Sequence, residues 1–348
     1  MSTFLAAALP LALAATIDVP AGADLATALA RARPGDLVRL AEGAHRGGIS
    51  LPAGVRLEGA GAARTRLVAP EGLDALTADR DAHAAALSLE ASGPRCAVRV
   101  DGGTLRLTGV RAAGGGCGAR IVAGALEGVD LDVEGEVGLI GEGGAATIDG
   151  ARVRGARSGA TVHAGTLTLR NVAITGPSRE AGISVAGGVA SLHGVVIRSP
   201  GPAGIAVAAG ARVEGTAVVV AGASEEEGIP GACVQVRRGS LALSASTLVH
   251  CGGAAVEAAG GTVRLSAVDA AGGAAGGIVL LDGATAELDG NLLAGNGPGL
   301  VLAGGARATA RMNRWRVDPV FWVDCGSGAR VMLGDGERAR TPCGGGSP

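Results

Sequence analysis

The chain is poor in aromatic residues. Of its 348 residues, two are phenylalanine, two are tryptophan and none is tyrosine. Aromatic side chains supply the large, rigid faces on which sugar rings commonly stack, and none occurs between Phe4 and Trp315. This absence argues against a polysaccharide-processing groove along the repetitive part of the chain. Trp315 and Trp322 are expected to seal a C-terminal cap rather than to form such a platform.

The chain also lacks an excess of either charge. Its formal net charge is −2, and acidic and basic residues are interspersed. Nucleic-acid-binding surfaces need clustered Lys and Arg, so no nucleic-acid partner is expected. Charges interrupt the apolar stretches before they reach the roughly 20 residues that span a bilayer, so no membrane span is expected.

The N-terminus resembles a secretory signal. Residues 4–14 are uncharged and mostly apolar, and Ala12 to Ala14 form a small-x-small cleavage pattern. The usual preceding Lys or Arg is missing. We predict a signal peptide over residues 1–14 and a secreted or cell-envelope location; the alternative is a cytoplasmic chain with an apolar extension.

One short motif recurs from residue 183 to residue 300. Each copy is a run of alternating aliphatic residues followed by a glycine turn, as in AGISVAGG, AGIAVAAG and AAVEAAGG. The steps between copies are 22, 29, 22, 22 and 22 residues, measured between these first inward aliphatic residues: Ile183, Ile205, Val234, Val256, Ile278 and Leu300. A fixed period of this size is typical of a solenoid whose coils bury one another.

Each coil holds three short strands. In one coil, the second strand is Thr166 to Leu169 and the third is Val172 to Ile174. The chain contains 63 glycines, and glycines are expected at the corners between strands, where they allow positive φ angles. At the N-terminal end, Asp24 is expected to cap a helix over Leu25 to Arg33, which would cover the open end of the stack.

These features resemble a known superfamily. The segments Asp24-Leu25, Ala32 to Asp36, Glu42-Gly43 and Leu57 to Gly61 resemble the N-terminal cap and first coils of the right-handed parallel β-helix, or pectin-lyase-like, superfamily. The resemblance, over roughly residues 17–310, implies an all-β, right-handed parallel β-helix solenoid of three-strand coils with a short N-terminal capping helix. We therefore predict a β-helix over residues 15–310 and a C-terminal cap with a disulfide over 311–348.

The six cysteines fall in three close pairs, separated by 21, 18 and 18 residues, or nearly one coil: Cys96 and Cys117, Cys233 and Cys251, and Cys325 and Cys343. Neighbouring strands lie within the distance that a disulfide accepts, so three disulfides and an oxidising compartment are predicted. Metal binding is the alternative, but no Cys-x-x-Cys or paired Cys/His spacing supports it.

The longest coil carries an acidic loop with Glu225, Glu226 and Glu227. Polysaccharide lyases of the resembling fold usually hold Ca²⁺ with several carboxylates, and Ca²⁺ prefers about 6–8 oxygen ligands. The three glutamates are therefore the candidate Ca²⁺ site. Solvated charge is the ordinary alternative, because consecutive carboxylates on a flexible loop rarely converge on one ion. No other cofactor is expected.

A second acidic run alternates along residues 129–137. On one flat strand, its four carboxylates would lie on one face: Asp130, Asp132, Glu134 and Glu136. Arg152, Arg154 and Arg157 come one coil later and are expected to form a structural charge ladder with these acids, worth little per exposed pair.

Hydrolases of the resembling fold use paired Asp carboxylates with a nearby His. The sequence contains no Asp-Asp pair, and neither His163 nor His193 has a carboxylate neighbour in its motif. Both histidines are therefore predicted to be surface residues, and no catalytic residue is assigned.

Two functions follow from these observations. The first is an exported, non-catalytic structural, surface or adhesion-type module, because no convergent catalytic set is found. The alternative is a carbohydrate-active enzyme, a polysaccharide lyase or glycoside hydrolase, which the fold class includes. It predicts that the loop 224–227 borders one cleft with Arg179, Arg198 and Arg237. A polysaccharide or cell-surface partner suits both functions; the oligomeric state is not predicted.

Overall fold

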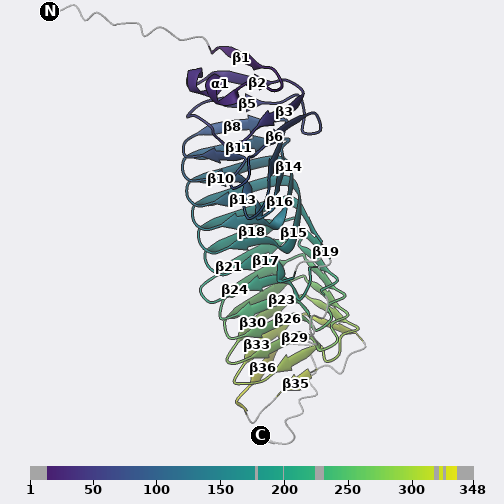
Figure 1. The fold of residues 1–348 in the computed structure, drawn as a ribbon. Coiled ribbons are helices and arrows are strands. Elements are labelled where there is room, and N and C mark those ends of the chain that lie inside the picture. Colours follow the sequence, from purple (N-terminus) through teal and green to yellow (C-terminus); the bar gives the residue numbers. More distant parts are fainter. Residues whose placement is uncertain are drawn as a thin grey trace, which may run out of the picture.

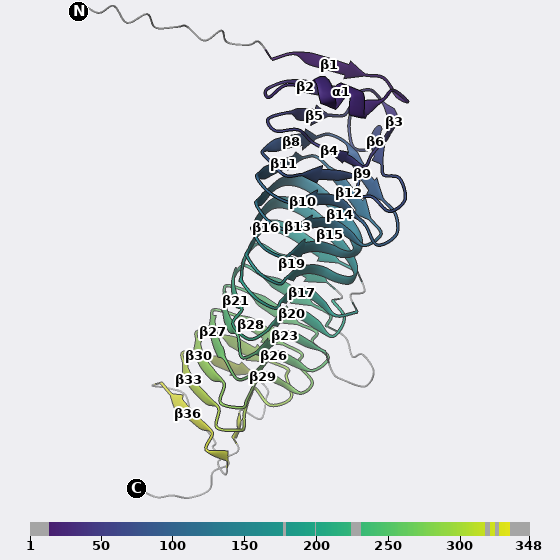
Figure 2. The same ribbon diagram turned by 60° about the vertical axis from the view of Figure 1, so that its left-hand side comes forward.

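The chain folds into one parallel β-helix of about 14 turns. The computed structural model describes residues 14–176, 179–198, 200–223, 231–316, 321–323 and 327–334. The coils stack along one axis, with the helix α1 at the N-terminal end and β36 near the other end (Figure 1, Figure 2). The predicted all-β, right-handed parallel β-helix is confirmed.

Each coil adds one strand to each of three walls, and the strands within a wall are parallel. Wall A contains β4 (Ile49–Ser50), β7 (Leu76–Ala78), β10 (Cys96–Val100), β13 (Cys117–Ile121), β17 (Ala181–Val185), β20 (Ala203–Val207), β23 (Ala232–Arg237), β26 (Ala254–Ala259), β29 (Gly276–Leu281), β32 (Leu300–Leu302) and β35 (Phe321–Val323).

Wall B contains β1 (Thr16–Val19), β2 (Leu37–Leu40), β5 (Arg56–Glu58), β8 (Ala82–Ala85), β11 (Thr104–Thr108), β18 (Val189–His193), β21 (Arg212–Thr216), β24 (Ser240–Ser244), β27 (Thr262–Ser266), β30 (Thr285–Asp289), β33 (Arg307–Arg311) and β36 (Arg330–Leu333). Wall C contains β3 (Gly43–Arg46), β6 (Thr65–Val68), β9 (Ser88–Ala91), β12 (Arg111–Gly114), β19 (Val196–Arg198), β22 (Val219–Ala221), β25 (Thr247–Val249), β28 (Asp269–Ala271), β31 (Leu292–Ala294) and β34 (Arg314–Arg316).

Three longer strands join the walls. β14 (Ala125–Gly141) and β15 (Ala145–Val162) run through walls B, C and A in turn, and β16 (Thr166–Thr175) runs through walls B and C.

The core consists of stacked aliphatic layers. The six repeat residues pair in register, coil to coil, and each is 0% exposed: Ile183, Ile205, Val234, Val256, Ile278 and Leu300. The 29-residue step leaves this column unbroken, because Ile205 still pairs with Val234. The predicted inward positions are therefore confirmed.

The helix α1 (Leu25–Arg31) closes the N-terminal end. Asp24 caps it by accepting a hydrogen bond from the backbone N–H of Ala26, the second residue of the helix, and Leu25 is buried. The helix ends two residues before the predicted Arg33, because the backbone of Ala32 is already extended.

The corner between walls B and C is sharp because each coil places a left-handed residue there. Positive φ angles occur at Ala86, Gly109, Asp130, Gly150, Asn171, Gly194, Ala217, Ala245, Ala267, Gly290 and Met312. Only some of these are glycine, so sequence alone marks the corner incompletely.

Within the described ranges, two disulfides join neighbouring coils. Cys96 and Cys117 have Cα atoms 4.4 Å apart, and Cys233 and Cys251 have Cα atoms 5.2 Å apart. The predicted third pair, Cys325 and Cys343, lies outside the described residues, as do residues 1–13 of the predicted signal peptide.

The described part of the 311–348 segment adds strands in register with the preceding coil. There Trp315 packs, partly buried, against the core. No helix among the described residues is both long and apolar enough to cross a membrane.

Candidate functional site

A groove of about 770 Å³ follows the corner between walls B and C, where β14, β15 and β16 turn. Ala62 and Ala63, in the loop between β5 and β6, form one side of it. A hollow of about 430 Å³ shares these two alanines and Arg111 and extends to Arg66 and Glu90. The two hollows therefore form one groove across wall C.

The loop over the groove, residues 59–64, is held at both ends. The buried Thr65 hydroxyl accepts a hydrogen bond from the Ala60 backbone N–H at 2.9 Å and donates to the Ala41 carbonyl at 3.2 Å. The Arg64 guanidinium contacts the Glu42 carboxylate. This anchoring keeps the loop beside the wall.

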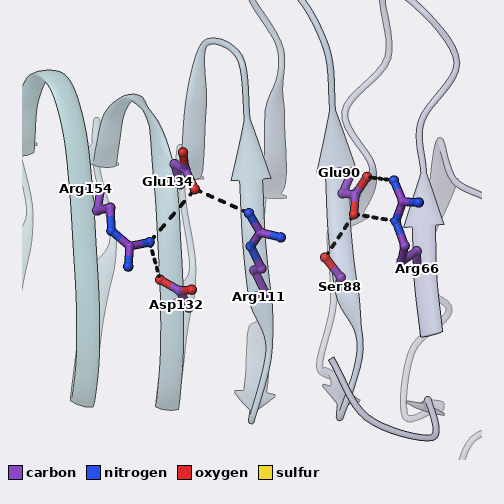
Figure 3. A network of polar contacts seen from close by, with 7 residues as sticks. All are labelled: Arg66, Ser88, Glu90, Arg111, Asp132, Glu134 and Arg154. Atoms are coloured by element: carbon purple, nitrogen blue, oxygen red, sulfur yellow. Dashed lines mark hydrogen bonds and ion pairs between the residues drawn. The ribbon is translucent and has the colours of Figure 1, made fainter. Parts of the chain in front are cut away.

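Strand register assembles the charged side chains of wall C. Alternate residues of a strand point outward, and parallel register places corresponding side chains about 4.8 Å apart from coil to coil. One outward column runs through Arg66, Ser88, Arg111, Asp132 and Arg152. The next column brings Glu90, Glu134 and Arg154 alongside it (Figure 3).

At one end of the groove, the Arg66 guanidinium donates two hydrogen bonds to the Glu90 carboxylate. Its Nε donates to Glu90 Oε1 at 2.8 Å and its Nη2 to Oε2 at 2.5 Å, while the Ser88 hydroxyl donates to Oε1 at 3.3 Å (Figure 3). The hydrogen bond from Arg66 is the main cause that lowers the pKa of Glu90 below its ordinary value.

Further along, Arg154 bridges two carboxylates. Its Nη1 lies 3.1 Å from Asp132 Oδ1 and 4.0 Å from Glu134 Oε2, and Arg111 Nη2 lies 3.4 Å from the same Glu134 oxygen (Figure 3). The predicted charge ladder thus forms through Arg154. Arg157 instead lies 3.8 Å from Glu180.

The prediction that the four carboxylates of residues 129–137 share one face is wrong. Asp130 occupies the left-handed corner, with φ of 53°, and the register shifts between Gly135 and Val137, next to Glu136. The chain therefore bends on both sides of the middle segment of β14. Only Asp132 and Glu134 share the outer face of wall C.

Two charged groups in the groove have no partner among the described residues. Among the described residues, neither the Asp130 carboxylate nor the Arg152 guanidinium makes a hydrogen bond or an ion pair, and both side chains line the groove and are exposed. A Cβ at Gly150 would lie only 3.0 Å from Asp130 Oδ1, so this glycine leaves room for the carboxylate. Asn171 lines the same groove and donates to Asp149 Oδ1 at 2.9 Å.

The other predicted site residues do not join this groove. Glu225, Glu226 and Glu227 lie outside the described residues. Arg198 lies on β19 of wall C and Arg237 on β23 of wall A, so these two arginines do not border one cleft as the enzyme alternative predicts. No group of three or more His, Cys, Asp or Glu side chains within the described ranges could hold a metal.

Sequence reasoning missed Arg111, Asn171 and the loop 59–64. Arg111, Asp132 and Arg152 are spaced by 21 and 20 residues, close to one coil, and this spacing could have identified their shared column. Their meeting with the loop depends on tertiary structure, for which the sequence carries no local signal.

No protein-family model matches the chain, and no curated protein matches its sequence. Among solved structures, the catalytic domain of a GH87 α-1,3-glucanase in complex with nigerose is similar, with TM-score 0.59 and 12% identity over 96% of this chain and 70% of that chain. The catalytic unit of a GH87 α-1,3-glucanase from Streptomyces thermodiastaticus strain HF3-3 is similar with TM-score 0.54 and 16% identity, over 86% of this chain and 66% of that chain.

Tailspike protein 3 of bacteriophage CBA120 is also similar, with TM-score 0.50 and 12% identity over 87% of this chain and 57% of that chain. The chain spans about two thirds of the two glucanase domains. Identities this low show a shared fold alone. The chain therefore has the parallel β-helix fold of pectin-lyase-like proteins.

Proposed function

We propose that this protein is carbohydrate-active: it binds a polysaccharide in the groove beneath the loop 59–64 and hydrolyses it. The observation that carries the proposal is the pair of unpartnered groups, Asp130 and Arg152, in a groove whose other charged side chains are largely paired. A charged side chain without a partner can hydrogen-bond to the hydroxyl or carboxylate groups of a sugar, because no ion pair has to be broken first.

Glycoside hydrolysis requires one carboxyl group as acid and a second as base or nucleophile. Both Asp130 and Asp132 line the groove: Asp130 occupies the left-handed corner, and Asp132 follows two residues later on wall C. Asp132 is oriented by Arg154 and is the candidate base or nucleophile. Asp130, unpaired, is the candidate acid, and Arg152 is the candidate sugar-binding group.

The fold comparison supports this function better than the non-catalytic one. The GH87 structures are catalytic domains, and one is described in complex with nigerose. The lack of aromatic residues in the lining of the groove does not conflict with it, because the groove offers hydrogen-bonding groups in place of stacking surfaces.

A polysaccharide panel tests the proposal. The wild-type protein is incubated with neutral glucans and acidic polysaccharides, with and without Ca²⁺, and reducing ends are measured. We expect cleavage of one class and at least a hundredfold loss of rate in Asp130→Asn and Asp132→Asn, because each removes a proton-transferring group. Ca²⁺ dependence that is lost when Glu225, Glu226 and Glu227 are changed to Gln would support the candidate Ca²⁺ site.

Asp269→Asn is the matched control. Asp269 is exposed in the same outward column of wall C, six coil steps from Asp132, or about 29 Å. This variant should retain the wild-type rate. Equal rates in all three variants, or no cleavage of any polysaccharide, would overturn the proposed function.

A further inference from the structure

A second hollow, of about 470 Å³, lies on wall B in the C-terminal half of the stack. It crosses β18, β21, β24, β27 and β30. Figure 1 labels β18, β21, β24 and β30 along one face, and β27 pairs with β24 and β30. None of the described residues lines both this hollow and the groove described above. We call it the wall B notch.

Ion-paired side chains form the two sides of the notch. Glu214 pairs with Arg212 on β21, and Arg264 Nε lies 3.0 Å from Glu287 Oε2 across β27 and β30. Ala242 on β24 is in register with Glu214 on one side and Arg264 on the other. Its short side chain leaves a gap of two coil steps, about 9.6 Å, between the two pairs.

A row of hydroxyl groups runs beside this gap. Thr216, Ser244 and Ser266 are in register on three successive coils, and Thr216 Oγ1 lies 2.9 Å from Ser244 Oγ. His193 is in register with Thr216 on the preceding coil, and Asp289 is in register with Ser266 on the following coil, so these two side chains flank the row. Both are exposed, and neither side chain bonds to any described residue.

These groups suit a neutral, hydroxyl-rich ligand. Each Ser or Thr hydroxyl can donate and accept one hydrogen bond, Asp289 accepts and Arg264 donates, while the Ala242 methyl offers a small apolar contact. The lining carboxylates outnumber the lining guanidinium, which disfavours a polyanion. Metal binding is not favoured, since the described residues hold no group of three His, Cys, Asp or Glu arranged for it.

We infer that the wall B notch binds a short stretch of neutral saccharide. The notch goes beyond the proposed hydrolysis: it holds no carboxylate of the groove, so it would anchor a glycan whether or not the groove cleaves one. Binding in the notch depends on the open space over Ala242 and on the hydroxyl row.

NMR titration with cellotetraose and maltotetraose, and with trigalacturonate as the anionic probe, tests this inference. We expect at least one neutral tetrasaccharide, at millimolar concentration, to shift the backbone amides of Ala242 and Ser244. Ala242→Leu fills the gap and should raise Kd at least tenfold, and Ser244→Ala should raise it severalfold. Ala271→Leu, at a half-exposed outward position of wall C, is the matched control and should bind as the wild type does.

Asp132→Asn separates the two sites and should leave notch binding unchanged. No shift at the notch amides with either neutral tetrasaccharide would overturn the inference. So would tighter binding of trigalacturonate than of the neutral probes, or an unchanged Kd in Ala242→Leu. If the groove proves inactive while Ala242→Leu still weakens binding, the notch stands and the proposed hydrolysis falls.

Discussion

At the scale of single residues, arginine sets the chemistry of the outer walls. The chain contains no lysine, so all 30 basic residues are arginine. A planar guanidinium can bind a carboxylate with two parallel hydrogen bonds, as Arg66 does with Glu90. Each exposed pair contributes little to stability. These pairs leave Asp130 and Arg152 as the charged groups of the groove that have no partner among the described residues.

The Arg66–Glu90 pair predicts a pH dependence of stability. The pKa of Glu90 is lowered from its ordinary value of 4.5, mainly by the Arg66 hydrogen bond. A carboxyl group with a lowered folded-state pKa stabilises the fold above its ordinary pKa, and this contribution is lost as pH falls through the folded-state pKa. The free energy of unfolding of the wild type should therefore exceed that of Glu90→Gln at pH 7, and the difference should vanish in strong acid.

Urea unfolding at both pH values measures this difference. In an Arg66→Gln background, Glu90→Gln should have a much smaller effect at pH 7, because the partner that lowers the pKa is gone. A wild-type advantage that is the same at pH 7 and in strong acid would contradict the account.

Ile205 tests the core assignment. Its side chain is 0% exposed and stacks between Ile183 and Val234, so Ile205→Asp would place an unpaired charge in an apolar layer. We expect a loss of about 4 kcal/mol or more in the free energy of unfolding. The neighbouring Ala206→Asp, at a half-exposed outward position, should cost about 1 kcal/mol or less. A thermal melt of Ile205→Asp within a degree of wild type would show that the assignment is wrong.

At the scale of elements, the corner between walls B and C decides where the site lies. Buried asparagines satisfy backbone groups beside this corner near the C-terminal end: Asn291 Oδ1 accepts from the Val268 N–H at 2.9 Å, and its Nδ2 donates to Asn313 Oδ1 at 2.8 Å. Earlier coils place apolar Val110 and Leu131 on the inner side of the corner and put their polar residues on the outer side. The groove lies in these earlier coils, where Ala62 and Ala63 line its other side.

The disulfides act at the same scale, as links between neighbouring coils. Removing Cys233–Cys251 with Cys233→Ala and Cys251→Ala should lower the free energy of unfolding by about 3 kcal/mol, because the bond closes an 18-residue loop in the unfolded chain. Denaturant unfolding of the oxidised wild type and the double variant measures this loss. Non-reducing peptide mapping should join Cys233 to Cys251. Recovery of these cysteines as free thiols, or equal stability of the two proteins, would count against the link.

At the scale of the whole molecule, the repeat made the architecture predictable. The aliphatic column from Ile183 to Leu300 could be read from the sequence because every coil repeats the same inward position. The groove could not be read in this way. Asp130 takes the left-handed corner position that glycine holds in adjacent coils, so residues 129–137 look like one flat strand. The opposite side of the groove comes from a loop about 70 residues earlier in the chain.

The two disulfides are consistent with an extracytoplasmic protein. The signal peptide over residues 1–14 and the third disulfide, between Cys325 and Cys343, stay predictions. Both predictions concern the compartment of the protein, whereas the groove and the notch concern the proposed binding of a polysaccharide.

The most direct test of the central claim is a crystal structure of Asp132→Asn with an oligosaccharide derived from the polysaccharide that the wild type cleaves. The account predicts sugar residues in the groove over Ala151, within hydrogen-bonding distance of Asp130 and Arg152 and beside the loop 59–64. A saccharide bound along wall A, with the groove empty, would contradict it.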